Sequence, residues 1–221
     1  MKKITLALLF SLGALALIGC HHASRPQELT LQPMEQSYQG VIPCADCSGI
    51  ETSLFLMEDG TYILQEHYQG RETAPRASYG QWARTADKLV LTAADGDKRY
   101  FRAHEESLEM LKRDGTPIVS TLNYTLHSVE QPLPTTPMAM HGLYHQQAGS
   151  ATFQDCATGK RYPVATSGLM AQALHRLQGR PEEEPVFLTL EGHYSQPGGE
   201  QAERTLVPDS TPQAHPGQQC D

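Results

Sequence analysis

Two of the five cysteines form a C-x-x-C motif at Cys44 and Cys47, which fits a redox-active dithiol, a site for a soft metal ion, or a short-loop disulfide. Catalytic dithiols lie at the N-terminus of a helix, where the helix dipole lowers the pKa of the first thiol. Here residues typical of a β-strand follow almost at once, so that source of activation is missing. Two thiolates would suit Cu(I), with Asp46, Met34 or Met57 as further ligands. We expect a small disulfide that opens and closes, and we keep Cys44 and Cys47 as a tentative metal pair.

A third cysteine, Cys20, ends a segment with two lysines, an apolar run at residues 4–18, and Gly19. This pattern is typical of a secretory signal and is too short for a stable membrane span. The cysteine directly after it makes a bacterial lipobox, which predicts cleavage between Gly19 and Cys20. The Cys20 thiol would then carry diacylglycerol and its amine a fatty acid such as palmitate, which anchors the chain to a membrane. His21 stands where an Asp would retain the protein at the inner membrane, so we expect delivery to the outer membrane.

The other four cysteines would face an oxidising compartment, where paired thiols are expected. Four cysteines allow three connectivities. Because each half of the chain holds one pair, the simplest choice is Cys44–Cys47 together with Cys156–Cys220. The second bridge would hold the C-terminal tail and close a long loop, so we expect it to be structural and to report failed oxidation by loosening its domain.

The charge balance makes nucleic acid an unexpected partner. Asp and Glu number 25 against 17 Lys and Arg, and loss of residues 1–19 removes two of those lysines, which leaves a mature charge of about −10. Such a chain repels phosphate backbones. The sequence holds no nucleophile elbow, H-E-x-x-H motif or phosphate loop, and its histidines read mostly as solvent-facing. We therefore expect no enzyme and no required cofactor, with copper as the one metal to consider.

Composition divides the chain into five parts. Residues 1–19 are the signal peptide and residues 20–33 a polar tether. Residues 34–130 form a first domain, residues 131–137 (QPLPTTP) a proline-rich linker, and residues 138–221 a second domain.

The first domain contains three Asp-Gly pairs between strand-like runs, and this dipeptide is a strong hairpin signal. We expect strands at residues 50–57, 61–68, 88–92, 98–103, 108–111 and 118–126. They predict an antiparallel meander that closes into a barrel, because closure removes exposed edges. Trp82 is expected to anchor the core of this barrel.

The second domain predicts five short strands with one helix among them. We expect the strands at residues 138–145, 151–155, 160–164, 186–192 and 204–207. Residues 168–177 place Leu169, Ala173, Leu174 and Leu177 at helical spacing. This order of elements is that of an OB-type barrel.

Several long motifs resemble the NlpE family of outer-membrane lipoproteins, also called copper homeostasis protein CutF. They are the lipobox at Cys20 and the segments Gly40–Thr52, Ala77–Leu91 and Asp155–Arg161. The resemblance implies a lipocalin-like first barrel and an OB-like second domain. It also implies a role in activating the Cpx envelope-stress system through the inner-membrane sensor kinase CpxA, together with roles in surface adhesion and copper tolerance.

We therefore expect an outer-membrane lipoprotein, facing the periplasm or the cell surface, that signals to the periplasmic domain of a CpxA-type kinase. Its triggers would be surface contact, lipoprotein mislocalisation and failed disulfide formation. The alternative is a Cu(I)-binding or copper-delivery protein that uses Cys44 and Cys47. Carriage of a lipid would need an empty barrel interior, and small barrels are usually filled by their own side chains.

Overall fold

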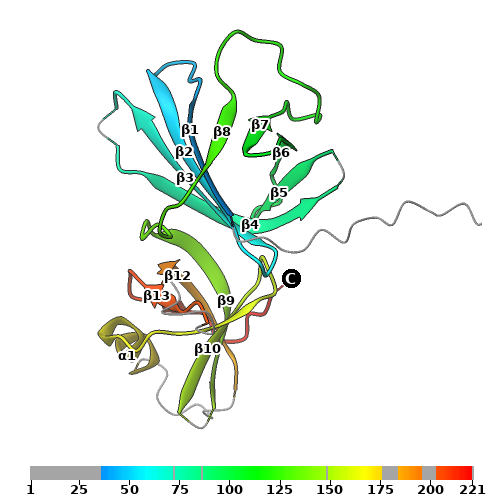
Figure 1. Ribbon diagram of the computed structural model, residues 1–221. Coiled ribbons are helices and arrows are strands. Elements are labelled where there is room, and N and C mark those ends of the chain that lie inside the picture. Colours follow the sequence, from blue (N-terminus) through cyan, green and yellow to red (C-terminus); the bar gives the residue numbers. More distant parts are fainter. Residues whose placement is uncertain are drawn as a thin grey trace, which may run out of the picture. The chain divides into compact units, whose positions relative to one another are not determined.

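The structure, a computed structural model, describes residues 36–71, 73–85, 87–147, 149–175, 184–195 and 203–220. The predicted signal peptide, Cys20 and the tether lie outside these residues. The described chain is mainly β, with a closed eight-stranded barrel followed by a second, curled sheet (Figure 1). The barrel strands are β1 (Gln36–Ile42), β2 (Gly49–Leu56), β3 (Thr61–Gln69), β4 (Arg76–Arg84), β5 (Leu89–Ala93), β6 (Lys98–Ala103), β7 (Ser107–Met110) and β8 (Thr125–Val129).

The three Asp-Gly pairs form turns, as predicted. Gly60, Gly96 and Gly115 have φ angles of 83°, 86° and 76°, a region that side chains with a Cβ rarely enter. The first turn joins β2 to β3 and the second joins β5 to β6. The third closes only a single bridge from Leu111 to Pro117. The expected strand at 118–126 is therefore wrong, and the strand that pairs with β7 begins at Thr125.

The barrel closes because its first and last strands pair. Residues Ser37–Gln39 of β1 lie opposite His127–Val129 of β8, so the meander has no free edge at this position. Side chains that point inward from all eight strands fill the interior. The buried members of this inner core are Tyr38, Ile42, Leu54, Leu56, Tyr62, Leu64, Leu89, Leu91, Phe101, Leu108 and Leu126.

Two barrel strands had no clear counterpart in the sequence pattern. β1 begins within a polar stretch, and β4 (RASYGQWAR) shows no clean apolar alternation. Trp82 on β4 is half-buried and donates its indole N–H to the Met57 carbonyl at 2.9 Å. It therefore packs at the margin of the inner core and ties the β2–β3 turn to β4.

The second sheet has the strand order β11-β10-β9-β12-β13, and β14 pairs with β12. A parallel bridge between Val164 and Leu206 brings the two ends of this sheet together, which curls it. The strands are β9 (Met138–Gln147), β10 (Ser150–Asp155), β11 (Arg161–Pro163), β12 (Val186–Tyr194), β13 (Leu206–Pro208) and β14 (Gln213–Ala214).

The predicted helix is present as α1 (Gly168–His175). Ser167 caps its N-terminus, because the Ser167 hydroxyl accepts the Met170 N–H at 3.2 Å. Met170 and Ala173 are the buried residues, whereas Leu169 is only half-buried. The side chain of Leu174 and all of Leu177 lie outside what the structure describes. Among the described residues, no helix has both the length and the apolar character needed to span a bilayer.

The outer surface of the barrel and the second sheet share one apolar core. Phe55, Met57, Ile63 and Tyr79 alternate with the inner-core residues of β2, β3 and β4, so they point away from the barrel interior. They cluster with buried residues of the second sheet: Met138, Met140, Tyr144, Phe153, Tyr162, Met170, Val186, Leu188, Leu190, Tyr194 and Leu206. We call this the shared core.

Candidate functional site

The C-x-x-C motif lies in the loop that joins β1 to β2. Cys44 and Cys47 form a disulfide, and both are only half-buried. The Ser48 N–H donates to the Gln69 carbonyl at 3.3 Å, so the loop sits beside the end of β3. With strands on both sides and no helix N-terminus at the motif, this loop lacks the dipole of a thiol oxidoreductase. A half-exposed pair on a short loop is instead open to reductants from solvent.

The second disulfide joins Cys156 to Cys220, 64 positions apart, and it closes the C-terminal tail over the second sheet. The tail first pairs with β12 through β14, and the His215 N–H donates to the Phe187 carbonyl at 2.8 Å. The Cys156 N–H donates to the His141 carbonyl of β9 at 3.0 Å. The bridge therefore links the tail on β12 to the end of β10, beside β9.

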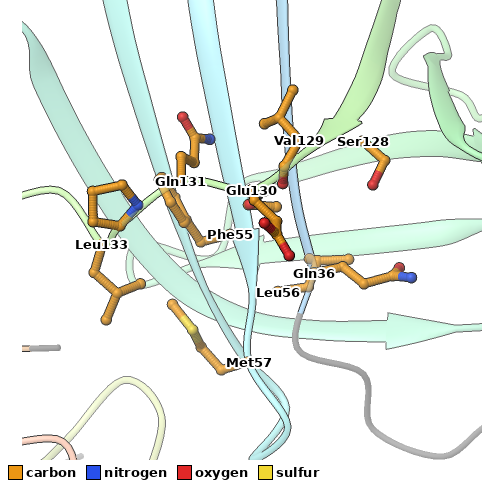
Figure 2. Close-up of a pocket in the computed structure, with 11 residues that line it drawn as sticks. Gln36, Phe55, Leu56, Met57, Ser128, Val129, Glu130, Gln131 and Leu133 are labelled. Carbon is orange, nitrogen blue, oxygen red and sulfur yellow. Dashed lines mark hydrogen bonds between the residues drawn. The ribbon is translucent and has the colours of Figure 1, made fainter. Parts of the chain in front are cut away.

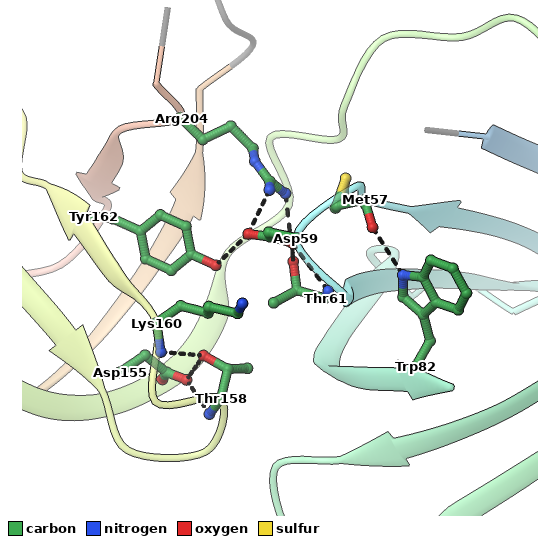
Figure 3. Close-up of polar contacts among 9 residues, drawn as sticks. All are labelled: Met57, Asp59, Thr61, Trp82, Asp155, Thr158, Lys160, Tyr162 and Arg204. Atoms are coloured by element: carbon green, nitrogen blue, oxygen red, sulfur yellow. Dashed lines mark hydrogen bonds and ion pairs between the residues drawn. The ribbon is translucent and has the colours of Figure 1, made fainter. Parts of the chain in front are cut away.

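The residue before this disulfide connects the second sheet to the barrel. Asp155, the last residue of β10, is fully buried, and its Oδ1 accepts the hydroxyl of Tyr79 from β4 at 2.6 Å. Its Oδ2 accepts the Thr158 N–H at 2.7 Å and the Thr158 hydroxyl at 2.6 Å (Figure 3). Gln81 adds a bond from its side-chain N–H to the Thr158 carbonyl at 2.9 Å. We call this set of contacts the Asp155 contact.

A second polar contact begins at Asp59, in the Asp-Gly turn between β2 and β3. The Asp59 carboxylate binds the Arg204 guanidinium at 2.6 Å and accepts the Tyr162 hydroxyl at 3.2 Å (Figure 3). Burial alone would raise the pKa of Asp59, but hydrogen bonds from Thr61 and the charge of Arg204 outweigh it and lower this pKa. Because Arg204 is only 12% exposed, this ion pair is better shielded from water than a surface pair.

Three tyrosine rings meet in the shared core beside these contacts. The ring of Tyr194 lies 4.6 Å from that of Tyr162 and 6.5 Å from that of Tyr79, edge-on in the second case. Burial, followed by the neighbouring carboxylates and phenols, raises the pKa of each of the three. Inside the barrel, burial raises the pKa of Tyr62 to about 12.

These buried phenols predict loss of stability in alkali. Below pH 10 the phenols are neutral in both states, so their contribution is fully present. Above pH 10 the unfolded chain ionises while the folded chain does not, and each such tyrosine then removes about 1.4 kcal/mol per pH unit. For Tyr62 the loss continues to about pH 12. Urea midpoints measured from pH 8 to pH 11 should fall, and the fall should be shallower in Tyr62→Phe. Constant stability over this range would contradict the assignment.

Comparison with known proteins places both halves of the chain. Residues 38–121 match the model for the NlpE N-terminal domain, and residues 134–221 match that for the NlpE C-terminal OB domain. Lipoprotein NlpE of Escherichia coli (strain K12) is 44% identical over an aligned length of 230 residues, gaps included. The alignment covers 99% of this chain and 97% of the relative. The chain belongs to the NlpE family. It is therefore an envelope-associated lipoprotein of mainly β structure, as the motifs implied.

Two solved structures are also similar. The crystal structure of the Cpx pathway activator NlpE from Escherichia coli is 49% identical, with a TM-score of 0.40, and the match covers 85% of this chain and 98% of that chain. A structure from Shewanella oneidensis is 30% identical, with a TM-score of 0.39, and the match covers 44% of this chain and 90% of that chain.

The copper ligands predicted from the sequence can be checked against the geometry of the C-x-x-C loop. The two sulfurs and a carboxylate oxygen of Asp46 all lie within 4.8 Å of one another. In the disulfide form there is no thiolate to bind a soft ion, and Arg71 already pairs with Asp46. The loop therefore fits Cu(I) only after reduction, with Cys44 and Cys47 as ligands.

Met57 is wrong as a supplementary ligand. It is buried in the shared core, directly after the end of β2 that lies opposite the C-x-x-C loop. Eight strand residues separate the two positions, which is about 25 Å at the usual rise. Met34 lies outside the described residues.

Sequence reasoning missed the residues that join the barrel to the second sheet. Asp59 was predicted only as a turn residue, and Asp155 only as the end of a strand within a family motif. Tyr79 was named only within a family motif, and Tyr162 and Arg204 only lay within expected strands, so no contact among these residues was predicted. A signal was present in the apolar runs LFLM and YIL of β2 and β3, because uninterrupted apolar residues indicate a strand that is buried on both faces.

A hollow at the rim of the barrel lies where β1 begins and β2 and β8 end. It has a volume of about 630 Å³, and Figure 2 shows Phe55, Met57 and Leu133 beside the polar Gln36 and Gln131. This hollow is open and lies beneath the linker, whereas the barrel interior is filled by the inner core. A lipid carried inside the barrel is therefore not supported.

Proposed function

We propose that this lipoprotein activates a Cpx-type envelope-stress system through the periplasmic domain of a CpxA-type kinase. Its triggers would be its own mislocalisation, surface contact and the failure of its disulfides. The 49% identity to the Cpx pathway activator NlpE of Escherichia coli, together with membership of the NlpE family, supports this role. The observation that carries the proposal is the position of Asp155, which directly precedes Cys156 and binds Tyr79 of the barrel.

The proposed mechanism couples the oxidation state of the second sheet to the surface of the barrel. With the bridge formed, the tail holds the end of β10, and Asp155 stays in register with Tyr79. Without the bridge, β10 loses that restraint and the Asp155 contact weakens. The outer side chains of β2–β4 then become available to a kinase, and the lipid anchor raises the local concentration of the two partners.

A Cpx-responsive reporter tests this coupling in cells that carry this chain as their only family member. Cys156→Ser with Cys220→Ser should raise reporter output several-fold. Cys44→Ser with Cys47→Ser is the matched control, because it removes a bridge at the end of the barrel away from the shared core. Equal output from the two double variants at equal protein levels would contradict the coupling.

The same reporter tests the anchor. Cys20→Ala, introduced into the Cys156→Ser and Cys220→Ser background, should lower the output because the protein loses its restriction to the membrane surface. Undiminished output from the unanchored protein would reject tether-dependent signalling.

A second candidate function is Cu(I) binding by the reduced Cys44 and Cys47, favoured by the grouping of both sulfurs with Asp46. Anaerobic titration of the reduced protein with Cu(I), against a competing chromophoric chelator, should give one ion per chain. The Cys44→Ser, Cys47→Ser variant should bind none, whereas Cys156→Ser, Cys220→Ser should bind as the parent does. Binding that survives loss of Cys44 and Cys47 would place the ion elsewhere.

A further inference from the structure

The outer face of the second sheet carries polar side chains that neither the shared core nor the disulfide uses. Along β9, Met138, Met140 and Tyr144 point into the shared core, so the intervening His141 and His145 point to the opposite face. His145 pairs across to Thr152 of β10, and His141 pairs to Thr189 of β12. We call this surface the outer face.

Two hollows lie at opposite ends of the outer face. The first, of about 440 Å³, is lined by His145, Gln146, Gln147, Ser150, Thr152 and Arg161. The second, of about 570 Å³, includes His141, Phe187, Thr189, Glu191 and Ser210. Both volumes fall in the range of small-molecule sites. Leu143 and Phe187, which pair between β9 and β12, form an apolar ridge between His145 of the first hollow and His141 of the second, and Phe187 also lines the second hollow.

The lining of the first hollow excludes several ligand classes. All six residues that line it carry polar groups, which are amide, hydroxyl, imidazole and guanidinium, so it does not suit an acyl chain. It has no carboxylate to hold a hard cation. Its lining has a single permanent cation, Arg161, whereas a polyphosphate backbone would need several. A ligand with many hydroxyl groups matches these neutral donors and acceptors.

Two further features of the outer face narrow the class of ligand. Arg161 donates to the Gln154 side-chain oxygen at 3.0 Å, and its exposed guanidinium has further N–H donors to offer a ligand. On the ridge, the Phe187 ring lies 6.1 Å from the rings of both His141 and His215, which makes an aromatic surface. Burial and the charge of Arg161 lower the pKa of His145, so its imidazole is uncharged at neutral pH.

We propose that the outer face binds an oligosaccharide that carries a carboxylate group. The carboxylate pairs with Arg161, the hydroxyl and amide groups bond within the two hollows, and a sugar ring lies across Leu143 and Phe187. Strands of an OB-type domain present ligands on such a face in other proteins. A protein of the cell envelope has carboxylated glycans within reach, in the cell wall or in surface polysaccharide.

The test is a titration of the acylated, ¹⁵N-labelled full chain in detergent micelles, followed by NMR. The probes are the disaccharide of N-acetylglucosamine and N-acetylmuramic acid, a uronic acid disaccharide, and neutral diacetylchitobiose. Saturable shifts of the β9 and β10 amides are expected with all three. A carboxylated probe should bind roughly tenfold more tightly than chitobiose, as for one charge-assisted hydrogen bond. Which carboxylated probe binds better identifies the source of the glycan.

Matched variants separate the site from a general surface effect. Arg161→Gln should remove the preference for the carboxylated probes, and Phe187→Leu should weaken all three. Lys98→Gln, on the barrel, should change neither the preference for the carboxylated probes nor the affinity for any of the three. If Arg161→Gln alters the spectrum of the free protein, Thr152→Val provides a second test, because it removes a hydroxyl of the first hollow and should weaken binding of the probes. Absent shifts, shifts confined to the barrel, or a preference that survives Arg161→Gln would overturn the proposal.

Discussion

Replacing Cys156 and Cys220 with serine should lower the free energy of unfolding by about 4 kcal/mol, because the bridge closes a loop of 64 positions in the unfolded chain. Urea unfolding at neutral pH measures this loss. The single tryptophan, Trp82, reports on the barrel next to Met57 of the shared core, and far-UV circular dichroism reports on both sheets. We expect the second sheet to unfold first, at a lower urea concentration than the fluorescence transition.

Cys44→Ser with Cys47→Ser is the comparison, since the two bridges differ mainly in loop length. Its cysteines are only three positions apart, so the same entropy model gives a loss of about 2 kcal/mol or less. The Trp82 and circular dichroism transitions should then stay together. Equal losses from the two double variants would show that loop closure does not explain the second bridge.

Asp155→Ala should cost about 3 kcal/mol or more. Asp155 is fully buried and accepts three hydrogen bonds, so its loss leaves the Tyr79 hydroxyl and the Thr158 donors without acceptors. A buried donor left unsatisfied costs about 1–3 kcal/mol. Tyr79→Phe removes only one of these three bonds, and Asp155 keeps its two bonds from Thr158. We therefore expect this variant to lose about 1 kcal/mol of unfolding free energy.

A double-mutant cycle of Asp155→Ala and Tyr79→Phe isolates the bond between barrel and second sheet. We expect the double variant to be less destabilised than the sum of the singles, because Tyr79→Phe removes the donor that Asp155→Ala orphans. Urea unfolding supplies the four free energies. Strict additivity would mean that the Tyr79 hydroxyl and the Asp155 carboxylate do not interact in solution.

Local signals in the sequence predicted turns and most strands. Asp-Gly at residues 59, 95 and 114 indicates a turn because glycine tolerates positive φ, and all three turns formed. Strand β8 was misplaced because the apolar residues of 118–124 carry no pairing information of their own. Strand β4 has two exposed arginines and a glycine, so its burial depends on neighbours that are distant in sequence.

The contact between barrel and second sheet was harder to foresee than either fold. Tyr79 and Asp155 are 76 positions apart, and each alone is an ordinary strand residue. The pairing of Asp59 with Arg204 is more distant still. The hydrophobic periodicity of the sequence does not encode such contacts, because they form only when the folded barrel packs against the folded second sheet. The C-x-x-C motif, by contrast, was recognised at once because its two sulfurs are neighbours along the chain.

The apolar outer side of β2–β4 is covered by strands that come much later in the chain. Phe55, Met57 and Ile63 are synthesised early, whereas the strands that bury them begin only at Met138. Until those later strands have been made, the barrel exposes an apolar patch that can associate with other chains. A chain that ended before Met138 would therefore keep this patch exposed and should aggregate unless a chaperone shields it.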